Sequence, residues 1–264
     1  MRATRAVTRG ISDTFARALV SHAPTTPIDV ARARRQHAAY VAALGGCGVE
    51  VTVLPPLHAF PDACFVEDCA VVAGGVAIVT RIGAPSRSGE EPSVGDCLAR
   101  WLRVETMRPP ATADGGDCLR AGSALFVGRS LRTNAAGVAA LAASLEPRGV
   151  RVVEAPVAGA IHLKCVCAPL DDERILAVEG ALPRASFDGF RVIDVPAAEA
   201  YAANAVSVNG TVLMAAGFPE TARILAAEGL RVVALDTSEF RKADGALTCL
   251  SILVDAADDA RAIG

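Results

Sequence analysis

The 264-residue chain carries 26 Lys and Arg against 29 Asp and Glu, a formal net charge of −3, and 52% of its residues are hydrophobic. Disordered chains are poor in apolar residues, so this composition excludes disorder and predicts a buried core. A slightly acidic chain has little to neutralise phosphates with, which argues against nucleic acid as a partner.

The beginning of the chain does not resemble a signal peptide, because the arginines within residues 1–15 have no apolar run behind them. The longest uncharged stretch, 200–218, contains Asn209-Gly210, which predicts a hairpin turn and not a membrane span. The eight cysteines show no zinc-binding spacing. We therefore expect reduced thiols in a cytoplasmic protein that does not contact a membrane.

A repeated pattern runs along the chain. Short β-branched segments beside Pro or Asp begin at Val49, Val104, Val150, Phe190 and Leu230. A second strand-like run follows each of them, beginning near Asp68, Asp117, His162, Asn204 and Cys249. Four of these runs predict hairpins, with turns at Gly74-Gly75, Ala121-Gly122, Asp171-Asp172 and Asn209-Gly210. Helical patterns follow the hairpins at 91–102, 134–145, 181–187 and 219–228.

The fifth repeat runs out of chain soon after Ser251. Its missing strand and helix are available at the other end of the chain, at 3–8 and 29–44. We therefore predict one domain over residues 1–264, a closed α/β ring of five modules in which both termini share the fifth module. Such closure removes exposed sheet edges. The alternative is an open α/β sheet whose strand–helix alternation only looks periodic.

Equivalent positions of repeated modules meet near the axis of such a ring, which brings together residues that are distant in sequence. Cys249 and His162 occupy equivalent positions, and a nucleophilic thiolate needs a neighbouring proton carrier, commonly His. A carboxylate is also needed to orient the imidazole, and Asp114 and Asp117 of the sequence Asp-Gly-Gly-Asp are the candidates. The two glycines allow a close approach of the backbone.

Charged residues of both signs suggest the ligand. Asp62, Glu67 and Asp68 lie in a loop among apolar residues, where carboxylates could bind a planar cation through paired hydrogen bonds. A metal is disfavoured because no His lies at ligand spacing among them, although Mg²⁺ stays open. Arg87 and Arg132 each follow a hairpin and precede a helix, where they could clamp a carboxylate. Together these residues predict an amino-acid-like zwitterion with a cationic side chain as the ligand.

With these residues in place, the chain resembles the dimethylargininases, the dimethylarginine dimethylaminohydrolases of the guanidine-modifying α/β-propeller (pentein) superfamily. The matching stretches follow the family order and extend over nearly the whole chain. They are 60–68, 80–87, 114–117, 127–134, 161–164, 202–204 and 236–251.

The resemblance implies hydrolysis of asymmetric dimethylarginine or monomethylarginine to citrulline and an alkylamine, with no metal or other cofactor. It implies that Cys249 attacks the guanidinium carbon and forms a covalent alkylthiouronium intermediate. His162 would protonate the departing amine and then activate water, with Asp114 orienting it. The family also uses Glu at the position of Asp114.

The resemblance also assigns the substrate-binding residues. Asp62, Glu67 and Asp68 match positions that engage the guanidinium end and the backbone of the substrate, Arg87 and Arg132 match a carboxylate clamp, Ala243 and Asp244 match a further binding segment, and Leu19 corresponds to a leucine on a mobile lid. The polar stretch 12–27 around Leu19 is compatible with a loop that closes over substrate and excludes water.

Three alternatives stay open. Arginine deiminases and other guanidine-modifying enzymes share this chemistry, but a chain of 264 residues leaves little room for the helical insertion of the deiminases. A catalytically silent arginine-binding protein is a second alternative, against which the presence of both Cys249 and His162 argues. The third alternative is zinc capture by Cys249 with His162 or nearby acidic residues, which would inhibit the protein and would not make zinc a cofactor. We expect a monomer or a homodimer with a small-molecule substrate.

Overall fold

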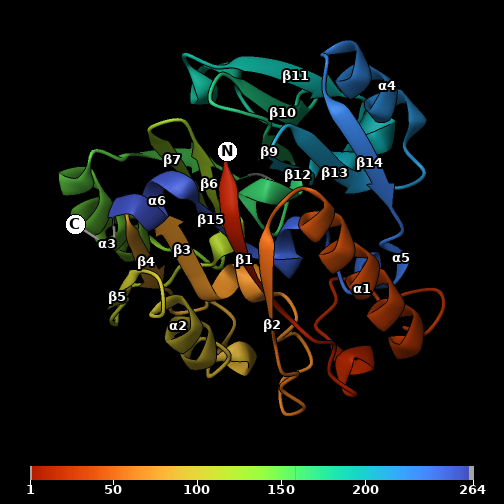
Figure 1. Ribbon diagram of the computed structural model, residues 1–264, viewed down its shortest axis with the longest axis horizontal. Coiled ribbons are helices and arrows are strands. Elements are labelled where there is room, and N and C mark those ends of the chain that lie inside the picture. Colours follow the sequence, from red (N-terminus) through yellow and green to blue (C-terminus); the bar gives the residue numbers. More distant parts are fainter. Residues whose placement is uncertain (1, 158, 262–264) are drawn as a thin grey trace.

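The computed structural model describes residues 2–157 and 159–261, whose strands form five three-stranded sheets arranged in a ring (Figure 1). In four of the sheets, a hairpin is joined by a third strand that runs parallel to its second strand. These sheets contain β3 (Ala70–Ala73), β4 (Val76–Val79) and β5 (Arg103–Thr106); β6 (Cys118–Ala121), β7 (Ala124–Arg129) and β8 (Arg151–Pro156); β9 (Cys167–Pro169), β10 (Arg174–Val178) and β11 (Arg191–Val195); and β12 (Val206–Val208), β13 (Thr211–Ala215) and β14 (Arg231–Leu235).

The fifth sheet joins the two ends of the chain. It contains β1 (Ala3–Arg9), β2 (Glu50–Leu54) and β15 (Ile252–Asp255), with β1 in the middle (Figure 1). Val7 pairs antiparallel with Ile252 and parallel with Thr52. This confirms the predicted closure, and the open-sheet alternative is wrong. The chain is a five-module α/β propeller.

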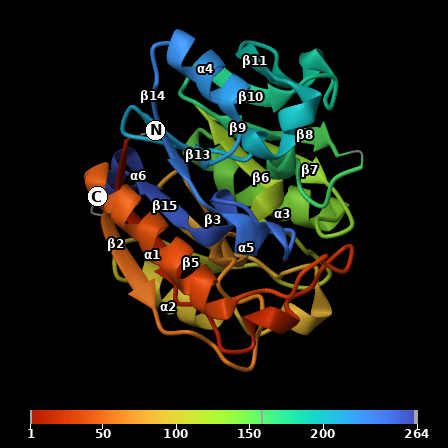
Figure 2. The ribbon, with the colours of Figure 1, turned by 90° about the vertical axis from the view of Figure 1, so that its right-hand side faces the viewer.

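The helices lie on the outside of the ring, and α1 lies beside α5 (Figure 2). Two of the long helices begin at side chains that accept a hydrogen bond from a free backbone N–H, since Asp29 accepts from Arg32 and Asn134 from Gly137. Apolar side chains between neighbouring modules form the core, as in the buried cluster that contains both Val71 and Leu141. The helices are α1 (Val30–Gly46), α2 (Pro92–Leu98), α3 (Ala135–Leu145), α4 (Pro219–Ala227), α5 (Ser238–Arg241) and α6 (Ala256–Arg261).

The local predictions need three corrections. The weak helical pattern at 181–187 forms only a 3₁₀ turn, Arg184–Phe187, because Pro183 restricts the residue before it. Helix α2 ends at Leu98 and not at 102, since β5 already begins at Arg103. One hairpin turn is formed by Gly122-Ser123, one residue later than expected.

A 3₁₀ turn precedes one strand of every sheet, namely β3, β6, β9, β12 and β15, and these turns meet around the axis. They are Val66–Cys69, Gly115–Asp117, Leu163–Cys165, Ala197–Ala203 and Thr248–Leu250. Their hydrogen bonds form a closed circuit: Gly116 N to Asp68 Oδ1 (2.9 Å), Leu163 N to Asp117 Oδ1 (3.0 Å), Asn204 Nδ2 to Lys164 O (2.9 Å), Thr248 N to Asn204 Oδ1 (3.0 Å) and Thr248 Oγ1 to Glu67 Oε2 (2.8 Å). We call this the axial ring. It confirms that equivalent positions of the repeats converge.

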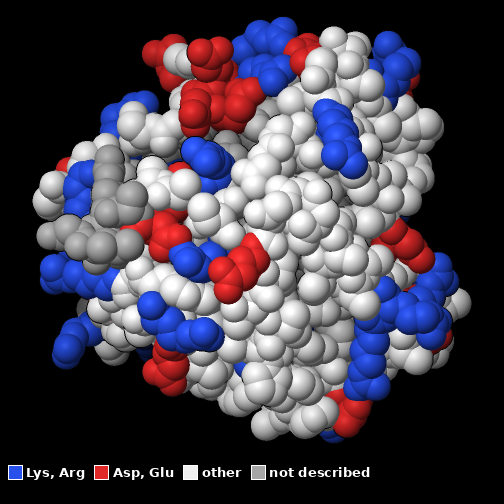
Figure 3. Space-filling model, viewed as in Figure 1, with Lys and Arg blue, Asp and Glu red and all other residues white. Residues whose placement is uncertain are grey.

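The surface mixes charges of both signs. On the face shown in Figure 3, basic and acidic side chains lie next to each other in small groups, separated by uncharged surface. Within the described part of the chain, none of the helices has the length and apolar character that a bilayer crossing needs.

Candidate active site

A cavity of about 410 Å³, here called the site cavity, opens beside the axial ring. Every residue predicted for the site lines it except Asp114, Glu67 and Asp117, the alternative carboxylate beside His162. Its lining includes Leu19, Asp62, Asp68, Arg87, Arg132, His162, Ala243, Asp244 and Cys249, together with apolar side chains such as Phe65 and Leu131.

The nucleophile candidate and the proton-carrier candidate meet in this cavity. Cys249 is half-buried in the 3₁₀ turn Thr248–Leu250, and His162 directly precedes the turn Leu163–Cys165. Asp114 lies behind His162, fully buried, with its Oδ2 3.0 Å from Nε2 of His162. Its Oδ1 accepts a hydrogen bond of 2.7 Å from the backbone N–H of Gly83. The predicted pairing of His162 with a carboxylate of Asp-Gly-Gly-Asp is therefore formed by Asp114.

The two glycines of this motif allow the close approach that the sequence predicts. A Cβ atom on Gly115 would lie 1.9 Å from the carbonyl oxygen of Glu67, and one on Gly116 would lie 2.5 Å from Nδ1 of His162. Any side chain at Gly116 would thus displace the imidazole.

Asp117 takes a structural role in the same turn. Its Oδ2 accepts hydrogen bonds from the hydroxyls of Ser130 (2.5 Å) and Thr133 (2.7 Å), while its Oδ1 accepts the backbone N–H of Leu163. Asp117 thereby holds the turn that follows His162.

Electrostatics set opposite protonation states for the two reactive groups. Burial lowers the pKa of His162. The negative charges of Asp68 and Asp117, together with the hydrogen bond to Asp114, outweigh burial and raise this pKa to about 9. Burial and the nearby carboxylates of Glu67 and Asp68 raise the pKa of the Cys249 thiol well above its ordinary value. Both shifts favour a cationic imidazole and a neutral thiol at neutral pH.

Asp68 and Arg87 form a buried ion pair at the wall of the cavity. Nη1 of Arg87 lies 2.6 Å from Oδ2 of Asp68, and Arg87 is also bound by the fully buried Glu90 at 2.8 Å. Burial raises the pKa of Asp68, but His162 and Arg87 hold it below its ordinary value. Burial also lowers the pKa of Arg87, yet Asp68 and Glu90 raise it well above its ordinary value. Asp68 and Arg87 are therefore both charged.

Residues 19–21 of the expected lid line the cavity, and two carboxylates bind their backbone. Asp62 accepts the backbone N–H of Leu19 at 3.0 Å, and Asp244 accepts that of Ser21. Asp244 has a φ of 54°, a left-handed conformation that is uncommon for a residue other than Gly. Leu19 and Val20 remain exposed at the rim.

Arg132 approaches the cavity from the segment after β7. It is half-buried, and its backbone N–H donates to Oγ of Ser130 at 3.0 Å. Gly83 allows this position, because a Cβ atom there would lie 2.4 Å from the carbonyl oxygen of Arg132. The Arg132 side chain lines the cavity together with Ala243.

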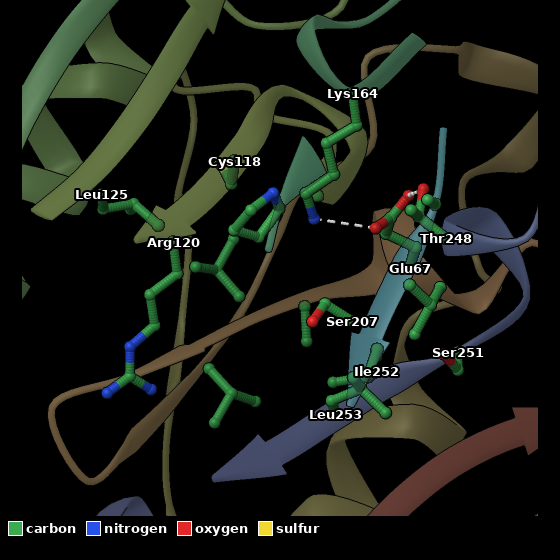
Figure 4. A pocket seen from close by; sticks show the side chains of 17 residues that line it. Glu67, Cys118, Arg120, Leu125, Lys164, Ser207, Thr248, Ser251, Ile252 and Leu253 are labelled. Carbon is green, nitrogen blue, oxygen red and sulfur yellow. Dashed lines mark hydrogen bonds and ion pairs between the residues drawn. The ribbon is translucent and has the colours of Figure 1, made fainter. Parts of the chain in front are cut away.

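Glu67 is placed differently from the expectation. Its carboxylate lines a second cavity of about 110 Å³ on the strand side of the axial ring, where Oε1 pairs with Nζ of Lys164 at 2.7 Å (Figure 4). Its Oε2 accepts the Thr248 hydroxyl at 2.8 Å. Asp68, one residue later, faces the site cavity. Glu67 therefore supports the turn that carries Cys249, and its geometry does not favour direct substrate contact.

Asp68, Asp114 and His162 have ligand atoms within 4.8 Å of one another, a set that could hold a metal ion. Protein donors already engage each carboxylate oxygen of this set, from Arg87 and Gly116 on Asp68 and from Gly83 and His162 on Asp114. A bound cation would have to compete with these contacts.

A ring of five α/β modules with this site at its axis defines a pentein, the class of guanidine-modifying propellers. No family model matches the chain. It is 40% identical over 254 residues to the N(G),N(G)-dimethylarginine dimethylaminohydrolase of Streptomyces coelicolor, covering 96% of this chain and 97% of that one. The enzyme of that name from Pseudomonas aeruginosa is 38% identical over 247 residues, covering 92% and 97%. The chain belongs to the dimethylarginine dimethylaminohydrolase family.

Solved structures agree with this placement. A cysteine-to-serine variant of the Pseudomonas aeruginosa enzyme, in complex with citrulline, superposes with a TM-score of 0.92 at 36% identity, covering 96% of this chain and all of that one. The N-terminal domain of ArgZ, an arginine dihydrolase, superposes with a TM-score of 0.85 at 22% identity, covering 96% and 97% of the two chains. At that identity the second likeness concerns the fold alone.

Proposed function

We propose that the chain hydrolyses N(ω)-methylated arginines to citrulline and di- or monomethylamine. The observation that carries this proposal is the convergence of Cys249, His162 and Asp114 at a cavity whose walls hold both carboxylates and arginines. The relatives named as dimethylarginine dimethylaminohydrolases, and the citrulline bound to one of them, support the same reaction.

The substrate binds as a zwitterion with a guanidinium side chain. A carboxylate has about four acceptor sites, so Asp68 can accept the guanidinium N–H groups while keeping its bonds to Arg87 and Gly116. Arg132 and Arg87 receive the substrate carboxylate. Asp62, next to the lid, receives the ammonium group.

The reaction begins when the substrate cation offsets the negative charge of Asp68, which lowers the pKa of the Cys249 thiol and releases its proton to solvent. The thiolate attacks the guanidinium carbon. The imidazolium of His162 then donates its proton to the substituted nitrogen, and the C–N bond breaks as the neutral amine leaves. An alkylthiouronium adduct remains on Cys249.

Hydrolysis of this adduct uses the same histidine in the opposite role. His162, now neutral, takes a proton from water, and the hydroxide adds to the thiouronium carbon. The C–S bond then breaks as the hydroxyl proton passes through solvent to the leaving sulfur, which releases citrulline and restores the Cys249 thiol beside the His162 imidazolium. Asp114 keeps the ring oriented through both steps, and Leu19 on the lid limits the entry of water.

We further propose that residues 1–264 act as one catalytic domain, as a monomer or homodimer in the cytoplasm. One feature supports the cytoplasmic assignment. All eight cysteines are free thiols, and thiols persist in a reducing compartment.

The test measures amine and citrulline release from dimethylarginine, monomethylarginine and arginine with no metal added. Release from the methylated substrates, absent in Cys249→Ser, is the expected result. Preference for arginine would instead identify a deiminase. No turnover of any substrate, together with no labelling of Cys249 by a haloamidine, would identify a non-catalytic binding protein.

A further inference from the structure

Glu90 is a fully buried carboxylate that the proposed mechanism does not use. It follows the 3₁₀ turn Pro85–Arg87, three residues after Arg87. Burying a charged carboxylate is unfavourable unless a partner neutralises it. The guanidinium of Arg87 is that partner, since Nη2 lies 2.8 Å and Nε 3.1 Å from Oε2 of Glu90. Burial nevertheless raises the pKa of Glu90 to about 7, because Arg87 opposes the effect of burial only in part.

The contacts of Arg87 leave little freedom to its guanidinium. Nε and one hydrogen of Nη2 serve Glu90, the other Nη2 hydrogen serves the carbonyl oxygen of Phe65 at 2.9 Å, and one Nη1 hydrogen serves Asp68 at 2.6 Å. A guanidinium has five N–H donors. Among the described residues, a single Nη1 hydrogen therefore remains for a ligand, and Arg87 lines the site cavity.

Glu90 decides where this last donor points. Its two-point contact fixes both the rotation and the depth of the guanidinium plane, because a planar fork can satisfy two bonds to one carboxylate only in one orientation. Without the carboxylate, Asp68 would be the only acidic partner and could draw both Nη groups toward itself. The donor for the substrate would then be lost, although the positive charge would remain.

We propose that Glu90 is a positioning residue that aims Arg87 at the substrate's carboxylate and thereby makes the site selective for amino acids over guanidines that lack a carboxylate. This inference deepens the proposed function and rests on it. The reacting guanidinium carbon is at the other end of the substrate. Arg87 keeps its charge and its ion pair with Asp68 when Glu90 is replaced, so Asp68 can still hold the substrate guanidinium. Glu90 therefore governs recognition of the carboxylate and has little effect on the bond-breaking steps.

The test is Glu90→Gln, which keeps the size of the side chain but replaces one acceptor oxygen with a donor. Two substrates are compared, monomethylarginine and its decarboxylated counterpart, methylagmatine. We expect KM for monomethylarginine to rise about tenfold with kcat changed less than threefold, because one charge-assisted hydrogen bond is misdirected. For methylagmatine kcat/KM stays the same, so the selectivity ratio falls about tenfold.

Glu91→Gln is the matched control. This variant carries the same chemical change one residue later in the chain. The Glu91 carboxylate accepts the backbone N–H groups of Gly89 (2.8 Å) and Ile82 (3.3 Å) and does not hold Arg87. This variant is expected to keep the wild-type ratio. Glu90→Asp retains the charge with a shorter reach and should lower the ratio by a smaller factor, which provides the test if Glu90→Gln does not fold.

A second readout separates positioning from packing. Labelling of Cys249 by chloroacetamidine, a haloamidine without a carboxylate, should proceed at the wild-type rate in Glu90→Gln. An unchanged selectivity ratio would overturn the proposal, as would an equal loss for both substrates with slowed labelling. Failure of the proposed function itself is recognised separately, because the wild-type chain would then release no citrulline from monomethylarginine.

Discussion

Replacing Asp114 by Asn tests the electrostatic basis of the mechanism with the smallest possible change in shape. The amide can still accept the 2.7 Å hydrogen bond from Gly83, so the loop stays in place. The contact with Nε2 of His162 changes from a charged to a neutral one. Asp68 and Asp117 remain as the other carboxylates that raise the pKa of His162.

The size of the effect follows from these contacts. A hydrogen bond to a charged group contributes about 1.5–3 kcal/mol, and 1.36 kcal/mol corresponds to one pKa unit. The pKa of His162 should therefore fall from about 9 to between about 7 and 8. The imidazole also loses its orientation, so kcat should drop about 100-fold, the lower end of what general acid–base catalysis supplies.

Two measurements check this expectation. An NMR titration of the imidazole carbons, with His162→Gln assigning the signal among the four histidines, gives the pKa. The pH profile of citrulline release should lose its high-pH limb at a correspondingly lower pH. A pKa of His162 that stays near 9 in Asp114→Asn, or a kcat within threefold of wild type, would refute the reasoning.

Other predictions address the backbone and the stability. Gly116→Ala places a methyl group 2.5 Å from Nδ1 of His162, so kcat should fall at least tenfold. Circular dichroism would verify that the variant still folds. Turnover at the wild-type rate would contradict the close contact. Because the folded pKa of His162 is raised from 6.5 to about 9, it contributes roughly 3 kcal/mol to the free energy of unfolding below pH 6.5, a contribution lost as the pH rises through 9. Urea unfolding at pH 6 and pH 9 measures this loss, which His162→Gln should lack. Asp258 accepts the backbone N–H of Gly75 at 3.0 Å and pairs with Arg120. Asp258→Asn removes the charge from this contact and should lower the free energy of unfolding by about 1–3 kcal/mol in the same assay, without lowering kcat.

The ring could be predicted from the sequence because its signals are local and repeated. The β-branched segments and the Asn209-Gly210 turn depend only on neighbouring residues in the chain. The incomplete last module is recognised by comparison with the four complete ones. The turn at Asn209-Gly210 is formed with φ values of 48° and 78°, the left-handed pair that such a sequence favours. Counting the modules predicts that the ring closes through both ends of the chain. Closure in turn predicts that Cys249 and His162 meet, and both line the site cavity.

The direction of individual side chains could not be predicted in the same way. In a 3₁₀ turn successive side chains point about 120° apart, so Glu67 and Asp68 separate to opposite sides of the axial ring although both are acidic neighbours in sequence. Their sides depend on Lys164 and Arg87, which come from different modules. Glu90 was missed because an acidic residue three positions after an arginine is common, and only its complete burial distinguishes it.

The shared fifth sheet has a consequence for synthesis of the chain. Strand β1 is made first and its partner β2 follows about 40 residues later in the chain, but the other edge of β1 has no partner until β15, some 250 residues later, has left the ribosome. Cys249 lies in the turn directly before β15. A chain that stops short therefore lacks both the last ring strand and the nucleophile, so that only complete synthesis assembles a reactive thiol beside His162.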